Sequence, residues 1–263
     1  MRRLLVMAFV LLGGGAALAF NAERVLVFFF DATRTPPQDN RLEEITWRAS
    51  DGTRLILWRA RPTAGKPSVL YFHGNAGNLA DRAARFSWFL DQGFGLVAMA
   101  YPGSSGSEGT VSSKAINRYA QEVYAAMPEL LGDGPAALYG ESLGTGVALQ
   151  LAAGLEMPPA GVVLEAPYTS ILDIGRRSYP RLGPYLHYLG DPWVSRENIL
   201  TLAAPLLILH GTRDTTIPAD MGQALFDLAP GKDKRLVLVE GAGHGNVWQP
   251  QAKRALARFL NRL

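Results

Sequence analysis

Residues 135–153 read PAALYGESLGTGVALQLAA, and this stretch decides the fold of the chain. An apolar strand over residues 135–139 gives way to a helix over residues 143–153, with Gly-Glu-Ser-Leu-Gly (140–144) at the junction. A serine on such a sharp strand-to-helix turn presents its hydroxyl at the open end of a sheet. The flanking glycines let the backbone turn that tightly. The pattern predicts that Ser142 is a nucleophile and not part of an ordinary glycine-rich turn.

The composition fits one large globular domain. The chain has 263 residues, 48% of them hydrophobic and 19% charged, which excludes a disordered protein. The net charge is only +3, and no basic stripe with interleaved aromatic residues appears, so the sequence gives no support for nucleic-acid binding. There is no cysteine, and the four histidines are widely dispersed, so we expect no metal site.

The N-terminus differs from the rest of the chain. Arg2 and Arg3 precede an uncharged stretch over residues 4–20. Two interpretations stay open: a signal peptide cleaved near Ala19, giving a secreted or periplasmic protein, or an uncleaved single-pass membrane anchor. The apolar run at residues 25–30 favours the anchor, or a strand that docks on the core. The positive-inside rule then places the catalytic domain on the non-cytoplasmic side. We divide the chain into segment 1–24 and a domain over 25–263.

Strands and helices alternate through that domain. Residues 42–48 and 53–59 flank the turn Ser-Asp-Gly (50–52) and predict an antiparallel hairpin. Further strands are expected at residues 68–72, 94–100, 135–139, 161–164, 205–209 and 235–239, and helices at residues 79–92, 112–127, 143–153, 219–228 and 251–263. This alternation predicts an α/β fold with a mostly parallel central sheet, helices on both faces and an antiparallel N-terminal hairpin. Such sheets bind ligands beyond the C-terminal ends of their strands.

One stretch interrupts the alternation. Residues 169–201 contain no strand pattern but several aromatic residues, among them Tyr179 and Trp193. Structureless connections of that length are uncommon unless they are functional. We therefore expect a small cap insertion over the ligand-binding edge, with an ordinary long connection as the alternative.

A serine nucleophile needs a base to take its proton. His244 lies in the loop Gly-Ala-Gly-His-Gly (241–245) after the last strand, which suits a general base. We expect His210, at the end of a strand, to be structural, and His73 to brace its loop. His187 lies in the expected cap, with no strand end beneath it.

An acid must orient the base. Asp214 follows the strand at 205–209, and the order Ser142, Asp214, His244 is the one expected for this kind of sheet. Glu165, directly after the strand at 161–164, is the reserve candidate.

The tetrahedral intermediate needs two backbone donors. The N–H of Leu143 follows the nucleophile and is expected to supply the first. The segment His-Gly-Asn-Ala-Gly-Asn (73–78) is expected to supply the second, from Asn75 or alternatively from Ala76. That segment is not a phosphate cradle, because no Lys-Ser/Thr pair follows it.

With these residues assembled, the chain resembles the α/β-hydrolase superfamily, and within it the membrane-anchored serine hydrolases of the BEM46/ABHD12–ABHD13–ABHD17 type. The matching segments are VLYFHGNAGNL (69–79), YGESLGTGVALQLA (139–152), VVLEAPYTSILDI (162–174), LLILHGTRDTTIP (206–218) and GAGHGN (241–246). The resemblance implies a Ser142–Asp214–His244 triad, no cofactor, an N-terminal membrane segment, and hydrolysis of acyl esters or thioesters of lipids or lipidated proteins.

The sequence thus predicts a serine hydrolase of the carboxylesterase, lipase or thioesterase kind, acting on an acyl ester or thioester substrate through an acyl-enzyme. Two alternatives stay open. One is another reaction on the same fold, namely peptide cleavage or perhydrolysis. The other is a non-catalytic, membrane-tethered binding module.

Overall fold

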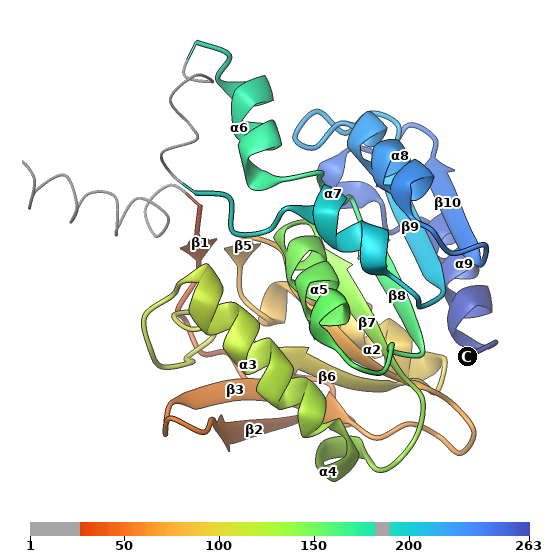
Figure 1. Ribbon diagram of the computed structural model, residues 1–263. Coiled ribbons are helices and arrows are strands. Elements are labelled where there is room, and N and C mark those ends of the chain that lie inside the picture. Colours follow the sequence, from red (N-terminus) through yellow and green to blue (C-terminus); the bar gives the residue numbers. More distant parts are fainter. Residues whose placement is uncertain (1–26, 182–189) are drawn as a thin grey trace, which may run out of the picture.

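The computed structural model describes residues 27–181 and 190–263. Its centre is an eight-stranded sheet with the strand order β10-β9-β8-β7-β4-β6-β3-β2 (Figure 1). The parallel strands are β4 (Ser68–Phe72), β6 (Gly95–Met99), β7 (Ala136–Glu141), β8 (Gly161–Glu165), β9 (Leu206–Gly211) and β10 (Lys234–Val239). At one edge, β2 (Glu43–Arg48) and β3 (Arg54–Ala60) form the antiparallel hairpin. The predicted sheet, including its N-terminal hairpin, is confirmed.

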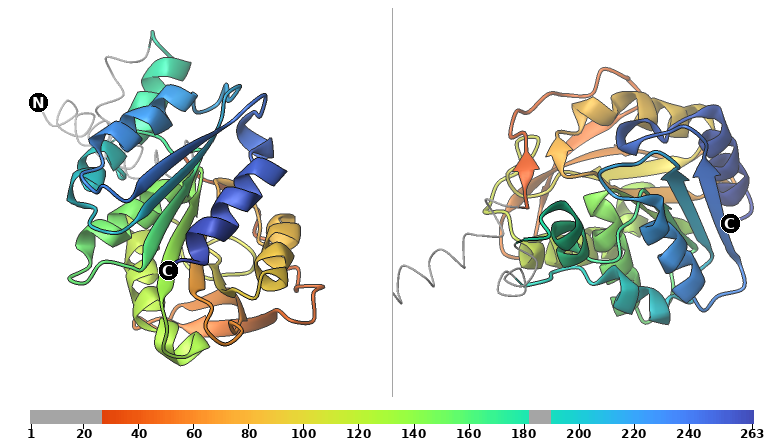
Figure 2. Two further views of the ribbon diagram at one scale, coloured as in Figure 1. Left: turned by 90° about the vertical axis from the view of Figure 1, so that its right-hand side faces the viewer. Right: turned by 90° about the horizontal axis from the view of Figure 1, so that it is seen from above.

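Helices cover both faces of this sheet (Figure 2). One face carries α3 (Ser113–Ala125), α4 (Met127–Leu131), α5 (Leu143–Gly154), α7 (Ser195–Asn198) and α8 (Ala219–Leu228). The other face carries α2 (Ala83–Asp91) and α9 (Pro250–Leu260). Successive strand residues point to opposite faces, so Leu70 joins one core and Tyr71 the other. Both faces of the central strands are therefore buried, and for this reason their sequences are unbroken apolar runs.

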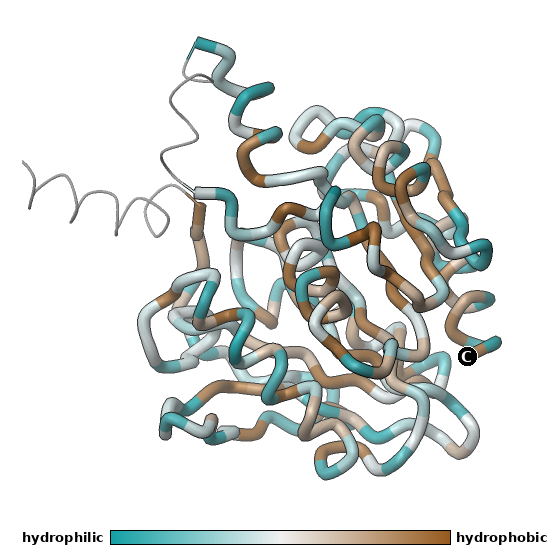
Figure 3. Tube along the Cα trace, viewed as in Figure 1, coloured by the Kyte–Doolittle hydropathy of each residue, from teal (hydrophilic) through white to brown (hydrophobic). Residues whose placement is uncertain are grey.

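Hydrophobic residues follow the central strands and α5 (Figure 3). In α9 the buried residues recur at spacings of three and four, as expected for a helix with one face on the core. They are Ala252, Ala255, Leu256, Phe259 and Leu260. α5 is different, because it lies between the sheet and other helices and is buried on nearly every side. The helix behind the predicted nucleophile is therefore firmly held.

Several predicted boundaries were wrong, among them the following three. The expected helix 79–92 begins as a 3-10 turn, η1 (Ala80–Arg82), before α2. The expected helix 112–127 ends at Ala125, and α4 begins at Met127 with Pro128 in its first turn, where the missing proline N–H costs nothing. β7 continues two residues past its expected end, so Glu141 still belongs to the strand when the chain turns at Ser142.

A small second sheet was not predicted. β1 (Phe29–Phe30) pairs in parallel with β5 (Ala76–Gly77), away from the main sheet. Phe28 is buried, and the Phe30 ring packs against the rings of Tyr101 and His73. The described part of the 25–30 run is therefore a strand docked on the core. Among the described residues no helix is long and apolar enough to cross a membrane, and the predicted segment 1–24 lies outside them.

The expected cap contains short helices. α6 (Ile171–Ser178) stands out from the body, and α7 continues into η3 (Ile199–Thr201) (Figure 1). No residue of α6 is fully buried. Trp193, in contrast, is completely buried, and its Nε1–H donates to Asn117 Oδ1 at 2.8 Å. Residues 182–189, with Tyr185, His187 and Tyr188, lie outside the described residues.

Candidate active site

The turn between β7 and α5 holds Ser142 in a strained conformation. Its φ is +50° and its ψ is −114°, a combination that a non-glycine residue rarely adopts. The two flanking glycines make this turn possible. A Cβ on Gly140 would lie 2.5 Å from Gly144 O, and a Cβ on Gly144 would lie 2.1 Å from Phe72 O. Both positions therefore exclude any side chain.

Among the three predicted triad residues, His244 lies within hydrogen-bond distance of both Ser142 and Asp214. His244 begins the 3-10 turn η4 (His244–Asn246), and its Nε2 lies 2.9 Å from Ser142 Oγ. Its Nδ1 lies 2.7 Å from Asp214 Oδ2. An ionised carboxylate only accepts, so Nδ1 carries the hydrogen and Nε2 is left as the acceptor facing the serine hydroxyl. This is the tautomer that a general base requires.

Asp214 has no exposed side-chain surface. Its Oδ1 accepts the N–H groups of Thr216 and Ile217 at 2.9 and 2.8 Å. Burial raises the pKa of Asp214, but contacts with His210, His244 and the Ile217 N–H outweigh it and hold the pKa well below its usual range. The carboxylate therefore stays charged beside the imidazole.

His210 supports the acid loop and lies apart from the nucleophile. It is fully buried, and its Nε2–H donates to Ile217 O at 2.8 Å. The same nitrogen lies 3.6 Å from Asp214 Oδ2. These contacts agree with the structural role that we expected for His210.

The reserve acid, Glu165, is engaged elsewhere. Its carboxylate is almost completely buried, pairs with Arg85 and accepts the hydroxyl of Tyr139. Asp214, and not Glu165, contacts His244. Glu165 belongs to a buried ion-pair cluster that the sequence did not reveal, together with Arg82, Arg85 and Glu141.

Glu141 ties that cluster to the nucleophile, because it directly precedes Ser142. Its Oε1 and Oε2 accept Arg82 Nη2 and Nε at 3.1 and 3.2 Å, and Oε2 also accepts the Tyr71 hydroxyl at 2.7 Å. Burial raises the pKa of Glu141, but Arg82 and Arg85 outweigh this and lower it to about 2. In the sequence, the only indication of this contact is that an acidic residue, Glu141, directly precedes the serine of the Gly-Glu-Ser motif.

We call residues 73–79 the oxyanion loop. Asn75 lies between β4 and β5, and in the described part of the chain neither its N–H nor that of Leu143 donates to another protein group. Both residues line the same cavity as Ser142, as does Ala76, the alternative donor, which belongs to β5. Two amides with free hydrogens beside the nucleophile are what an oxyanion hole requires.

His73 braces this loop from within the core. Its Nδ1–H donates to Gly74 O at 2.8 Å, and its own carbonyl accepts the Tyr101 hydroxyl at 3.0 Å. Burial lowers the pKa of His73 to about 4, so its ring is neutral at physiological pH. His73 does not contact Ser142, in agreement with its expected bracing role.

Two cavities meet at Ser142 and His244. The first, of about 430 Å³, has a largely apolar wall. Its apolar lining consists of Val27, Leu143, Tyr168, Ile171, Ile174 and Ile217. The spacing of Ile171 and Ile174 on α6 is the sequence signal for this wall. The expected cap region thus lines the cavity through α6.

The second cavity, of about 240 Å³, has a charged wall. Its charged lining consists of Asp81, Arg82, Arg85, Glu141 and Glu165. A largely apolar cavity and a charged cavity therefore both border Ser142, and Arg82 and Glu141 line them both. Within residues 27–181 and 190–263, no group of acidic or histidine side chains is arranged to hold a metal ion.

Comparison with known proteins places the chain in a family. It is 34% identical over 257 residues to the uncharacterized protein Rv2307c of Mycobacterium tuberculosis, covering 93% of this chain and 89% of that one. It is 28% identical over 249 residues to the lysophosphatidylserine lipase ABHD12 of Rattus norvegicus, covering 84% of this chain but only 62% of the lipase. The chain belongs to the ABHD12-like α/β-hydrolases. No protein-family model matches it.

Solved structures agree on the α/β-hydrolase fold. The Pyrococcus furiosus esterase Pf2001 superposes with a TM-score of 0.72 at 18% identity, over 90% of this chain and 99% of the esterase. The monoacylglycerol lipase of Paleococcus ferrophilus superposes with a TM-score of 0.61 at 22% identity, over 78% of this chain and 98% of the lipase. These structures confirm the predicted α/β-hydrolase fold, and the relatives named as a lipase and an esterase support ester hydrolysis.

Proposed function

We propose that this α/β-hydrolase cleaves carboxylic ester or thioester bonds of single-chain acyl lipids through a Ser142–His244–Asp214 triad. The observation that carries the proposal is the unbroken path of contacts from Ser142 Oγ through the His244 ring to Asp214. Such a path is the arrangement needed to remove a proton from a serine hydroxyl.

The proposed reaction has two halves. Ser142 Oγ attacks the acyl carbonyl while His244 Nε2 takes its proton, and the N–H groups of Asn75 and Leu143 stabilise the oxyanion. Collapse of the intermediate breaks the bond to the alcohol or thiol, which leaves with the proton from His244. Water then attacks the acyl-enzyme by the same route and releases the fatty acid. Asp214 stabilises the imidazolium in both halves.

The two cavities suggest how a substrate would lie. The apolar cavity borders the two proposed oxyanion donors, so it suits the acyl chain. The charged cavity borders Ser142 and His244 but neither donor, so it suits the polar alcohol that leaves beside the imidazole. An ester that joins one apolar chain to a polar head matches both. The name of the ABHD12 relatives, lysophosphatidylserine lipase, supports a substrate of this kind.

We also propose that residues 4–20 anchor the protein in a membrane, with the catalytic domain on the non-cytoplasmic side. Arg2 and Arg3 before an uncharged stretch support this orientation. Val27, a few residues further on, lines the apolar cavity. An anchor at this point would bring the cavity close to the lipid. Cleavage near Ala19 is the alternative, and mass spectrometry of the mature N-terminus distinguishes the two.

The direct test is labelling with a fluorophosphonate probe followed by a substrate panel. We expect the probe to modify Ser142, and p-nitrophenyl esters and thioesters to be cleaved at least about 100-fold faster than the matched anilides. Preferred cleavage of the anilides, or a dominant peroxide-dependent reaction, would replace the proposed reaction by one of its alternatives. A protein that the probe does not label would be a binding module.

Activity should depend on pH through the imidazole. A protonated His244 has no lone pair for the serine proton, so kcat/KM should fall toward acid pH, by about tenfold per pH unit at the acid end of the profile. The pKa of Asp214 is held well below its usual range, so this carboxylate stays charged and adds no second proton to that fall. A pH profile from 4 to 9 with a short ester is the measurement, and a flat acid side contradicts a histidine base.

A charge in the apolar wall should reduce activity selectively on long acyl chains. We expect Ile174→Asp to lower kcat/KM for a p-nitrophenyl dodecanoate about 10- to 100-fold, since each buried CH₂ contributes about 0.8 kcal/mol. The acetate ester should change less than about threefold, because its acyl group does not extend along α6. Leu172→Asp on the same helix, which does not line the cavity, is the matched control. Equal losses on both esters would place the acyl chain elsewhere.

A further inference from the structure

We propose that β1, the two-residue strand at Phe29–Phe30, holds the oxyanion loop in its catalytic conformation together with Asp31, the residue that follows the strand, and that Asp31 is a positioning residue. The inference rests on the proposed function, because it takes the N–H of Asn75 as an oxyanion donor. It assigns a role in catalysis to a segment that lies outside the main sheet.

The oxyanion loop needs such support. Its strand β5 pairs with β1 and not with the eight-stranded sheet. Gly77 has a φ of +74°, and a Cβ there would lie 2.0 Å from Asp81 Oδ2, so the loop depends on a glycine at its centre. Glycine gives a segment more conformational freedom than other residues do. Contacts from outside must therefore restrict where the Asn75 N–H points.

β1 and Asp31, the residue after it, supply these contacts from their main chain. The N–H of Phe29 donates to Asn75 Oδ1 at 3.2 Å, and the N–H of Asp31 donates to Gly77 O at 3.0 Å. The first bond holds the side chain of the very residue whose amide is the proposed donor. The second holds the loop two residues further on. The short segment 29–31 thus holds both the Asn75 side chain and the loop that follows it.

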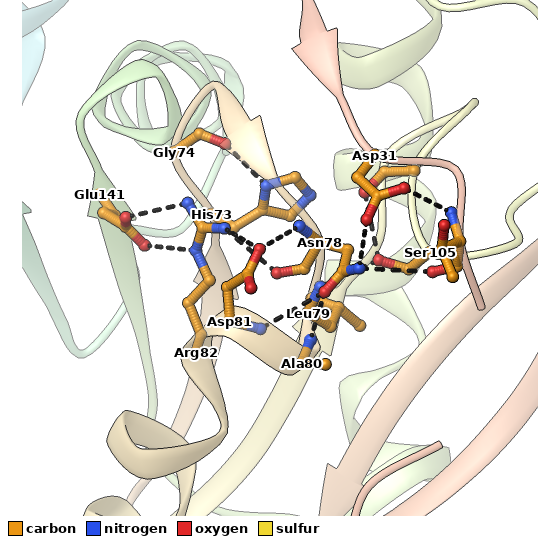
Figure 4. Close-up of polar contacts among 12 residues, drawn as sticks. Asp31, His73, Gly74, Asn78, Leu79, Ala80, Asp81, Arg82, Ser105 and Glu141 are labelled. Carbon is orange, nitrogen blue, oxygen red and sulfur yellow. Dashed lines mark hydrogen bonds and ion pairs between the residues drawn. The ribbon is translucent and has the colours of Figure 1, made fainter. Parts of the chain in front are cut away.

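The Asp31 carboxylate extends this support (Figure 4). Its Oδ2 accepts Asn78 Nδ2 at 2.8 Å, and the Asn78 Oδ1 in turn accepts the Ala80 N–H at 2.9 Å, where η1 begins. The backbone N–H of Thr33 lowers the pKa of Asp31, which keeps the carboxylate charged. The Asp31 carbonyl accepts the Ser105 N–H at 2.9 Å. Asp31 therefore joins the loop to its neighbours on two sides.

The same network reaches the nucleophile from the other side (Figure 4). Arg82 Nη1 donates to Asn78 O at 3.1 Å, while its Nη2 and Nε bind Glu141, next to Ser142. The polar contacts thus run from Asp31 through Asn78, Arg82 and Glu141 to the turn that carries the serine. Through this path, β1 sets the distance between the oxyanion donor and the attacking oxygen.

The position of β1 in the chain also connects the N-terminal segment to the oxyanion loop. β1 follows directly on the N-terminal segment, so the part of the protein proposed to attach to the membrane enters the fold at the oxyanion loop. A change in the conformation of residues 27–31 would then also change how well the oxyanion loop stabilises the transition state.

The test compares Asp31→Ala with a matched aspartate. Asp51 Oδ1 accepts the Thr53 N–H at 3.0 Å, the same local contact that Asp31 Oδ1 makes with Thr33 at 2.9 Å, but it lies at the β2–β3 turn. A misplacement of about 1 Å can cost about 100-fold in rate, so we expect Asp31→Ala to lower kcat about 10- to 100-fold on p-nitrophenyl acetate, with KM within about twofold. Asp51→Ala should keep kcat within about twofold. Asp31→Asn, which retains an acceptor oxygen for Asn78, should recover most of the loss.

A transition-state analogue separates positioning from stability. A trifluoromethyl ketone adds to Ser142 Oγ, the hydroxyl proton passes to His244, and the former carbonyl oxygen becomes an oxyanion in the hole. Its inhibition constant should rise in Asp31→Ala by the same factor by which kcat/KM falls, whereas a loss of folded protein alone would leave it unchanged. Asn75→Ala keeps the backbone donor but removes the acceptor of the Phe29 N–H. It should behave like Asp31→Ala and carries the test if Asp31→Ala does not fold.

The outcomes distinguish this inference from the proposed function. If Ser142→Ala is inactive while Asp31→Ala and Asn75→Ala keep kcat and the inhibition constant within about twofold of wild type, the positioning role is overturned and the triad stands. If Ser142→Ala retains full activity, the triad and this inference fall together. A parallel loss in kcat and in affinity for the ketone, with recovery in Asp31→Asn, supports the inference.

Discussion

Ser142→Ala is expected to lower kcat on a p-nitrophenyl ester by about 10⁴- to 10⁶-fold, the largest effect of any single substitution in this protein. The reason is chemical, because without the hydroxyl no acyl-enzyme can form and water must attack the ester directly. A residual rate of about 10³- to 10⁴-fold over water is expected from the oxyanion donors and binding alone. KM should change little, since the serine hydroxyl is a small part of the substrate contact.

The fold of this variant should be intact. Alanine meets the same backbone strain as serine at a φ of +50°, so the substitution adds no conformational cost. The matched control is Ser195→Ala, since Ser195 is fully buried, and its hydroxyl has no hydrogen-bond partner among the described residues. That variant should keep kcat within about twofold. Activity of Ser142→Ala close to that of the control, or fluorophosphonate labelling that persists in Ser142→Ala, would show that another group is the nucleophile.

Much of this arrangement could be predicted, because it depends on rules that connect sequence position to place in the fold. In a mostly parallel sheet, residues that follow different strands gather at the same edge. Ser142 follows β7, Asp214 follows β9 and His244 follows β10, so reading the strand ends was enough to expect them together. The glycines at 140 and 144 could be predicted to be necessary, although the groups they approach could not.

The missed second sheet and the missed ion pair depend on contacts between segments that are far apart in the sequence. β1 and β5 have two residues each, too few for a period-2 pattern to stand out, and they lie about 46 residues apart. The ion pair between Arg82 and Glu141 spans 59 residues, and nothing local to Arg82 indicates its partner. Periodicity reports which face of an element is apolar. It does not report how a loop is held, and several contacts that hold the oxyanion loop come from segments far away in the sequence.

The sequence favours Asp214 over Glu165 as the acid of the triad but does not show which of the two contacts His244. Both acids lie at or beyond the end of a strand, and strand order alone could not decide between them. The decision comes from the partners: Glu165 is neutralised by Arg85, while Asp214 has two backbone donors on one oxygen and His244 on the other. A carboxylate whose charge is already neutralised by a guanidinium stabilises an imidazolium less.

Asp214→Asn is expected to lower kcat by about 10⁴-fold, even though the substitution changes almost no volume. The asparagine Oδ1 can still accept the N–H groups of Thr216 and Ile217, which directs its NH₂ group toward His244 Nδ1. The imidazole must then accept at Nδ1 and carry its hydrogen on Nε2, where it faces Ser142 Oγ as a donor. A base in that tautomer cannot take the serine proton. Steady-state kinetics with a short ester measure the loss.

The control for this variant is Asp220→Asn, which changes a nearby acid that is exposed and paired with Arg177. It should keep kcat within about twofold. A second readout comes from stability, since the folded-state pKa of Asp214 lies below its unfolded value. That shift stabilises the wild type above the unfolded pKa and is lost as the pH falls through the folded pKa, so wild type should lose more stability in acid than Asp214→Asn does. If Asp214→Asn retained more than about a tenth of wild-type kcat, the carboxylate would not be what sets the tautomer of His244, and the acid of the triad would have to be sought elsewhere.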